Sequence, residues 1–183
     1  AITSNTSAIM PTHVYGYPCD VDKIESIARK YNLKVIYDAA HAFGVKCHCG
    51  SVLQHGDMSV LSFHATKVFN TFEGGAIICK DKNMKKSIDE FKNFGFSSEI
   101  SAEQIGLNGK MSEFNAALGL LQLKQIDSDI EKRKAVDAKY RLALKNIPGI
   151  RCHVKLNTGR NNYGYFPIFV DKTYPLSRDD LYE

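Results

Sequence analysis

Apolar residues at helical spacing mark the first predicted helix, which begins at Asp20 and follows a short extended segment, AIMPTHVYG. Ile24, Ile27, Ala28 and Tyr31 fall at positions i, i+3, i+4 and i+7 of this helix. Three apolar runs of strand length come next, LKVIYD, MSVLSF and GAIICK. Uninterrupted apolar runs are typical of strands in a sheet covered on both faces. The first half of the chain therefore predicts a layered α/β unit.

Helical spacing returns in NMKKSIDEFKNFG and ends at Gly95. Ser112 is a suitable N-cap for a long helix whose apolar stripe continues until the sequence NIPG interrupts it. IRCHV and YGYFPIFV predict strands, and Ser177 with Asp180 predicts a capping box that opens a last helix. We expect residues 1–125 to form part of a large α/β domain. Residues 126–183 would form a linking helix and the beginning of a small α+β domain.

The two ends of the sequence suggest a piece of a longer polypeptide. The chain starts at Ala1 without a methionine, and the last predicted helix has only a few residues. We expect an internal fragment that binds a ligand weakly and is inactive without its flanking segments.

Composition restricts the class of protein. The chain has 183 residues, 44% of them hydrophobic, and a net charge of +4 that is spread along its length. The basic stretch KDKNMKK predicts a solvated helix start, so we expect no nucleic-acid binding. No secretory signal is visible, and no apolar run approaches the roughly 18 residues that a membrane helix needs. These features predict a soluble, cytoplasmic globular protein with no membrane partner.

The five cysteines form an odd and scattered set, which favours reduced thiols over a disulfide framework. Only KCHCGSVLQH approaches a metal-binding pattern, with Cys47, His48, Cys49 and His55. It lacks the two-residue gap between cysteines of a zinc knuckle. The pattern therefore predicts a polar surface hairpin and no metal site.

Two charged residues stand at the ends of predicted strands. Asp38 ends LKVIYD, and Lys67 follows MSVLSF within a polar turn. Ligands of open α/β sheets bind at the carboxyl ends of strands. The two residues are compatible with a buried ion pair, and also with a Schiff-base lysine and the carboxylate that faces a pyridine nitrogen, as pyridoxal 5'-phosphate (PLP) requires. No G-x-G-x-x-G and no G-x-x-x-x-G-K-[ST] motif supports a nucleotide-binding alternative.

Three blocks of sequence decide between these alternatives. They are VIYDAAHAFG, GDMSVLSFHATKVFNTFEGGAI and IGLNGKMSEFNAALGLLQL, in that order. Together they closely resemble the DegT/DnrJ/EryC1/StrS family of PLP-dependent nucleotide-sugar aminotransferases of fold type I, over nearly the whole chain. The resemblance implies a three-layer α/β/α large domain. It also implies that Lys67 forms the Schiff base with the cofactor and that Asp38 pairs with its pyridine nitrogen.

The same resemblance assigns three further residues. His41 would lie near the phenolic oxygen of PLP, although a lone histidine is more often a satisfied core residue. Ser62 would bind the phosphate, where strand polarity is the simpler explanation. Asn108 would reach the phosphate in a neighbouring subunit, which implies a homodimer with shared active sites; an asparagine before glycine also suits an ordinary turn. His64 and Tyr15 are weaker candidates for the same site.

The resemblance implies an amino transfer, with glutamate as the donor, to a keto group of a dTDP-linked deoxysugar for polysaccharide or O-antigen synthesis. Lys67 would be both anchor and general base. One alternative is a PLP- or PMP-dependent sugar dehydratase, in which the lysine is replaced; its presence here favours transamination. A non-catalytic sensor or binding relative is the other alternative.

Overall fold

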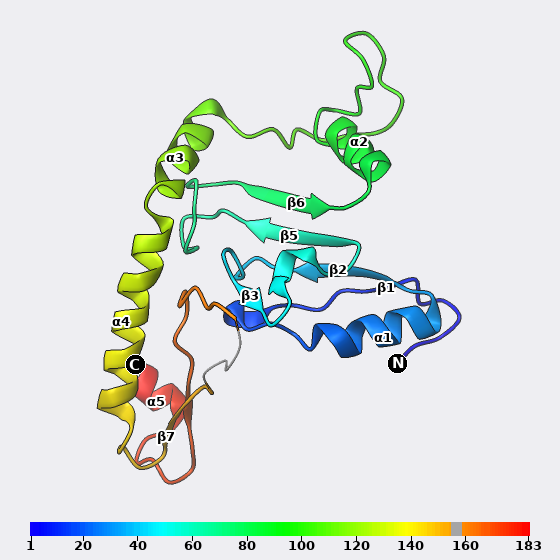
Figure 1. The fold of residues 1–183 in the computed structure, drawn as a ribbon. Coiled ribbons are helices and arrows are strands. Elements are labelled where there is room, and N and C mark those ends of the chain that lie inside the picture. The colour runs from blue at the N-terminus through cyan, green and yellow to red at the C-terminus, as the bar shows by residue number, and fades with distance from the viewer. Residues whose placement is uncertain (155–158) are drawn as a thin grey trace.

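A four-stranded sheet forms the centre of the computed structural model, which describes residues 1–154 and 159–183 (Figure 1). The strands are β1 (Ala8–Ile9), β2 (Lys34–Asp38), β5 (Met58–Ser62) and β6 (Gly75–Cys79), in the order β1-β2-β5-β6. The first three are parallel, and β6 is antiparallel to β5. Parallel pairing places the carboxyl ends of β2 and β5 at the same edge of the sheet.

Helix α1 (Val21–Tyr31) connects β1 to β2, as the apolar spacing predicts. The Asp20 side chain caps it by accepting a hydrogen bond from the Lys23 N–H, and Asn32 ends it in the left-handed conformation. Its inner face buries Val21 and Ala28 in a cluster with Val35 and Tyr37 of β2. The helix therefore fixes the strand that carries Asp38.

A small hairpin lies between β2 and β5. Strands β3 (Lys46–Cys47) and β4 (Gly50–Ser51) pair antiparallel, and a short 3-10 helix, η2 (Val52–Gln54), follows. A second 3-10 turn, η1 (Val14–Gly16), precedes α1. The prediction of a hairpin at KCHCGSVLQH is confirmed.

The long helix predicted from Ser112 is divided into α3 (Glu113–Leu123) and α4 (Ile126–Leu144). At the junction the N–H groups of Lys124 and Gln125 bond to carbonyls three residues earlier, which tightens the turn and redirects the chain. Burial decides the new direction, because Ile126 packs with Phe69 in a separate apolar cluster. None of the helices described, including α4 with its 19 residues, is long and apolar enough to span a bilayer.

Helix α2 (Lys82–Phe91) confirms the helical prediction that begins at NMKK. The C-terminal part contains β7 (Ile150–Cys152), β8 (Ile168–Val170) and α5 (Arg178–Tyr182). The strand predicted for YGYFPIFV is wrong over residues 163–167, where the aromatic side chains pack against other elements. The capping box of Ser177 and Asp180 is confirmed. The division into residues 1–125 and 126–183 stays a prediction.

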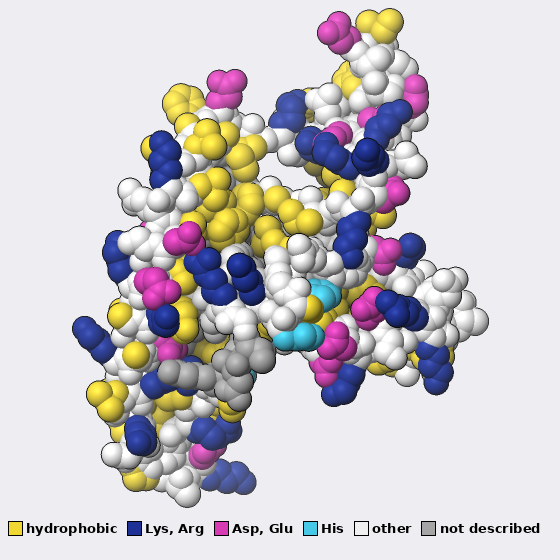
Figure 2. Space-filling view, viewed as in Figure 1, with side chains coloured by type: hydrophobic (Ala, Val, Ile, Leu, Met, Phe, Trp, Pro, Cys, Tyr) yellow, Lys and Arg dark blue, Asp and Glu magenta, His cyan; other side chains and the backbone are white. Residues whose placement is uncertain are grey.

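Both faces of the sheet are partly open at β6, because the consecutive residues Ile77 and Ile78 point to opposite sides, so the expectation of complete cover on both faces is wrong for this strand within this chain. Ile77 and Ile78 are 46% and 38% exposed, and Val60 of β5 is 39% exposed. Figure 2 shows hydrophobic side chains gathered between these strands and the helix α3. An uninterrupted apolar sequence therefore predicts the strand correctly. It does not predict whether the two faces of the strand are packed within this chain.

Replacing Ser112 by alanine is expected to lower the free energy of unfolding by about 1 kcal/mol. The Ser112 hydroxyl accepts a hydrogen bond of 3.2 Å from the Asn115 N–H at the start of α3. Urea titration of the two proteins measures the difference. Ser128→Ala, at an exposed position within α4, is the control; equal losses in the two variants would contradict the cap.

Candidate functional site

The site begins with Asp38, at the end of β2. Its main-chain carbonyl accepts a hydrogen bond from His13, and its side-chain Oδ1 accepts one of 3.0 Å from the Ala40 N–H. The strand register pairs Asp38 with Val60, two residues before the end of β5 at Ser62. Asp38 and Ser62 therefore occupy neighbouring strand ends at one edge of the sheet.

Lys67 lies in a loop, residues 63–74, that joins β5 to β6. The base of this lysine loop is closed by hydrogen bonds from Phe63 N–H to Gly74 and from Thr71 N–H to Phe63. The Asn115 side chain of α3 donates to the carbonyls of Thr71 and Glu73, at 2.8 and 2.7 Å. Helix α3 therefore holds the loop that presents the half-buried Lys67.

The pKa of His41 responds to the charges of both Lys67 and Asp38. Burial lowers the pKa of His41, the charge of Lys67 lowers it further, and the charge of Asp38 opposes both. No ion pair within 4.0 Å joins Asp38 and Lys67 in the part of the chain that the structure describes, so the alternative of a simple ion pair lacks support. The charges of Lys67 and Asp38 therefore both act on the imidazole of His41, in opposite directions.

The His41 ring is held in one tautomer. Its Nδ1 accepts a hydrogen bond of 3.0 Å from the Tyr15 N–H, so the neutral ring carries its proton on Nε2. Tyr15 has a φ of 55° and a ψ of 19°, a left-handed conformation that costs of order 1 kcal/mol for a residue with a Cβ. This strained backbone aims an N–H group at His41 and places Tyr15 beside that residue.

Two residues that sequence reasoning missed complete the surroundings of His41. The Tyr165 ring lies with its centroid 4.5 Å from that of His41 and 5.2 Å from that of Tyr15. Asn162 is fully buried and donates to the carbonyls of His41 and Phe43, at 2.8 and 2.9 Å. Tyr165 lies in the stretch interpreted as a strand, and Asn162 comes directly before it. The turn signal of Asn162 before Gly164 was the available clue.

The remaining residues predicted for the site are Ser62, His64 and Asn108. Ser62 Oγ accepts a hydrogen bond from the His64 N–H, and His64 lies in the lysine loop, where it contacts Thr66. Asn108 is exposed in the loop after α2 and pairs with Asn93 as an isolated bridge. Within residues 1–154 and 159–183, no hydrogen bond joins the Asn108 side chain to Asp38 or Lys67. A role toward a neighbouring subunit stays a prediction.

Replacing Asn162 by alanine is expected to lower the free energy of unfolding by about 2 kcal/mol. The change leaves the carbonyls of His41 and Phe43 without their buried donor. Denaturant titration measures the loss, and Asn146→Ala at an exposed position is the matched control. A loss no larger than that of the control would show that Asn162 does not hold the His41 segment.

The family is decided by a comparison over the complete chain. The model of the DegT/DnrJ/EryC1/StrS aminotransferase family matches residues 1–183. This chain belongs to that family. A "dTDP-4-amino-4,6-dideoxy-D-glucose transaminase" of Shigella dysenteriae is 59% identical, and one of Escherichia coli is 49% identical; the match covers 100% of this chain and 50% of each relative. The chain spans about half the length of the curated relatives it matches.

Solved protein structures share the fold of this chain. The structure of DesI with its TDP-sugar product superposes with a TM-score of 0.87 at 36% identity, over 94% of this chain and 44% of DesI. Helicobacter pylori PseC, an aminotransferase of pseudoaminic acid biosynthesis, gives 0.88 at 27% identity, over 93% of this chain and 47% of PseC. The predicted fold class, a partial α/β large domain of fold type I, is confirmed.

Proposed function

We propose that this chain is part of a PLP-dependent nucleotide-sugar aminotransferase that transfers an amino group from glutamate to the 4-keto group of a dTDP-linked 6-deoxyhexose. The observation that carries the proposal is the position of Asp38 at the end of β2, next to the end of β5 from which the loop with Lys67 leaves. Family membership supports the reaction class and the cofactor. The 59% identity to the Shigella transaminase supports the sugar and its carrier.

The residues at the strand ends fit PLP by the chemistry of their donors. Lys67 supplies an amine for the aldehyde, and Asp38 supplies a carboxylate that keeps the pyridine nitrogen protonated. Ser62 offers a hydroxyl for the phosphate. When bound, PLP provides the electron sink that makes removal of a proton from an amino acid α-carbon possible. The amine of Lys67 suits the aldehyde of PLP, and the negative charge of Asp38 suits its protonated pyridine nitrogen.

The protein residues then have distinct tasks in the reaction. Lys67 would hold the cofactor through its Nζ, and the same Nζ, as a free amine, would accept the proton from the substrate carbon. His41 stays neutral because burial and Lys67 lower its pKa, and its Nε2–H is a donor for an oxygen atom in the site. The Tyr165 and Tyr15 rings cover one side of this imidazole and limit its contact with water.

The homodimer with shared sites, the role of Asn108 at the partner's phosphate, cytoplasmic location and O-antigen synthesis are parts of the same proposal. The exposed position of Asn108 in a loop is compatible with a contact to a second subunit. Size-exclusion chromatography with light scattering tests the dimer. Asn108→Ala would then weaken PLP binding without changing the oligomeric state.

The decisive experiment uses the full-length protein with PLP, glutamate and a panel of 3-keto and 4-keto dTDP-sugars. We expect 2-oxoglutarate and an amino sugar to accumulate with a 4-keto substrate. A sensor would bind a sugar without releasing 2-oxoglutarate, and a dehydratase would remove a hydroxyl group without net amination. Either result, or amination at the 3-position alone, would reject the proposed reaction.

A further inference from the structure

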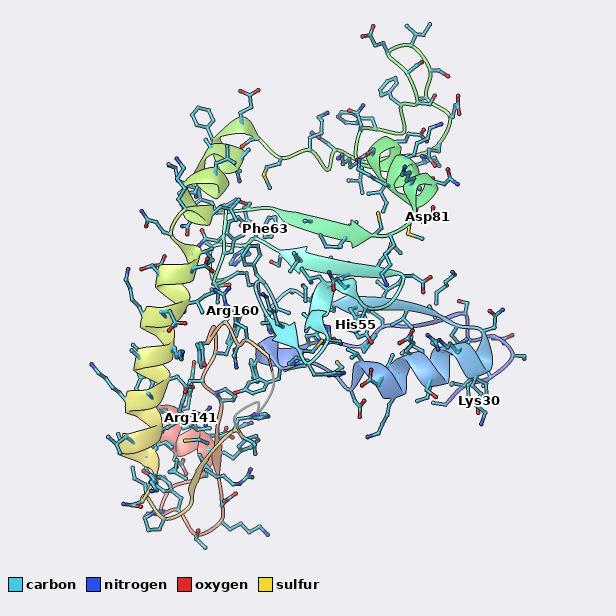
Figure 3. All side chains as sticks on the ribbon, in the orientation of Figure 1. Lys30, His55, Phe63, Asp81, Arg141 and Arg160 are labelled. Atoms are coloured by element: carbon cyan, nitrogen blue, oxygen red, sulfur yellow. The ribbon has the colours of Figure 1, made fainter. Side chains whose placement is uncertain are left out.

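Two cysteines and a histidine converge on the hairpin β3–β4, away from the strand ends that carry Asp38 and Lys67. The Sγ atoms of Cys47 and Cys49 are 3.1 Å apart. His55, at the end of η2, places its Nε2 3.3 Å from each of the two sulfur atoms. Figure 3 labels His55 beside the hairpin. Three soft donor atoms therefore form a nearly equilateral triangle.

This triangle is close to one face of a tetrahedral zinc site. Zinc–sulfur bonds of about 2.3 Å and zinc–nitrogen bonds of about 2.0 Å give edges of roughly 3.8 Å between sulfurs and roughly 3.5 Å from sulfur to nitrogen. The observed sulfur–sulfur edge is shorter than this by about 0.7 Å, and the two sulfur–nitrogen edges are shorter by about 0.2 Å. Small side-chain rotations would open the triangle around an ion, and the exposed Cys49 has room for them.

His48 is the candidate for a fourth ligand because it lies close to the two cysteines, although the group that it forms with them does not include His55. The ligand atoms of Cys47, His48 and Cys49 all lie within 4.8 Å of one another. The Nε2 of His48 is 3.5 Å from Asp22 Oδ2 on α1, which leaves Nδ1 for a metal. A carboxylate on the distal nitrogen is the usual support of a histidine that binds zinc.

We propose that Cys47, Cys49, His55 and His48 bind one Zn²⁺ ion. Soft thiolates with imidazole select zinc over the hard cations that prefer oxygen. The ion would join the hairpin to η2 and, through His48 and Asp22, to α1. Because η2 leads into β5, the site would stabilise the strand that carries Ser62 without entering the cofactor region. Each thiol loses its proton to solvent when the metal binds.

The spacing of the motif predicted no metal site because the cysteines are separated by a single residue. His55, which was part of that pattern, reaches the sulfurs through η2. Ser51 caps this short helix by accepting a hydrogen bond of 3.3 Å from the Leu53 N–H, and the chain then turns His55 back onto the two cysteines. The position of His55 therefore depends on the turn at η2 and not on the spacing between the cysteines.

The test is a Co²⁺ titration of the full-length, PLP-loaded protein, kept reduced and freed of metal. We expect a thiolate-to-cobalt charge-transfer band and the intense visible bands of four-coordinate cobalt at one ion per chain, both abolished by an equivalent of Zn²⁺. Cys49→Ser is expected to weaken binding at least about tenfold. Bound Zn²⁺ should also raise the midpoint of thermal unfolding of the wild type.

Cys152→Ser and Cys79→Ser are matched controls, because each removes a thiol outside the cluster. Cys47 is buried and its replacement risks misfolding, so the exposed Cys49 carries the test, and His55→Ala is the second variant. Equal cobalt binding by wild type and Cys49→Ser would overturn the proposal. The absence of a thiolate-to-cobalt band would also overturn the proposal. The same holds for a Cys47–Cys49 disulfide that forms under reducing conditions in place of zinc binding.

Discussion

Replacing Lys67 by alanine in the full-length protein is expected to lower the turnover of amino transfer by about 10³-fold. The lysine loop leaves β5 next to the strand end that carries Asp38, and the proposed reaction needs the amine of Lys67 both to anchor PLP and to carry a proton. Borohydride treatment followed by mass spectrometry of the peptides should find PLP attached to Lys67 in the wild type. The variant should retain no such covalent attachment.

Lys80→Ala is the matched control, because this lysine is exposed and follows β6 at the other end of that strand. It should keep both turnover and the covalent attachment. Added methylamine should restore part of the activity of Lys67→Ala, which a merely misfolded variant would not show. If Lys67→Ala keeps a borohydride-stable link to PLP, another residue is the anchor.

Lowering the pH from 7 to 4 is expected to reduce the free energy of unfolding by about 3 kcal/mol through His13 alone. Burial lowers the pKa of His13 to about 4, with His55 adding to the effect and Asp38 opposing it. The unfolded chain binds this proton below its ordinary pKa of 6.5, whereas the folded chain does not until about 4. Stability is therefore complete above pH 6.5 and is lost progressively as the pH falls toward 4.

The structure explains why His13 stays neutral. The ring is fully buried, stacks on Tyr37 at 4.7 Å, and uses Nδ1 to accept a hydrogen bond from the Cys19 N–H. Its buried Nε2 has no hydrogen-bond partner within the described chain, so a charge there would lack stabilisation.

Urea titrations at several pH values compare the wild type with His13→Asn, whose amide oxygen can replace the Nδ1 acceptor. The variant should lose about 3 kcal/mol less than the wild type between pH 6.5 and 4. His48→Asn, measured with a chelator present, is the control at an exposed position. Identical pH profiles for wild type and His13→Asn would contradict the assignment, since carboxylates contribute equally to both proteins.

Much of the fold follows from neighbours in sequence. The Asp20 cap and the apolar spacing after it predict α1, and apolar runs predict β2, β5 and β6 at nearly their observed bounds. The polar turn after β5 also contains Lys67, the lysine of the proposed site. These features depend on hydrogen bonds and packing between residues a few positions apart, which is why a single sequence is enough to predict them.

The sequence misled where distant contacts outweigh local preference. The apolar stripe after Ser112 continues past Leu123, but packing of Ile126 and Ile130 on Phe69 divides the helix there. The alternating aromatics near Tyr165 suit a strand, yet Asn162 takes this segment to the carbonyl of His41, 121 positions earlier in the chain. No pattern among neighbouring residues predicts a hydrogen-bond partner so far away in the chain.

The sequence by itself determined the family, the order of elements and the chemical identity of the lysine and carboxylate at the strand ends. Only the tertiary structure decided which groups surround them: Tyr15 and Tyr165 beside His41, Asn115 on the lysine loop, and His55 on the two cysteine sulfurs. The physical reason is that caps and periodic burial act over a few residues. A site is assembled by the pairing of strands and by loops that return to them.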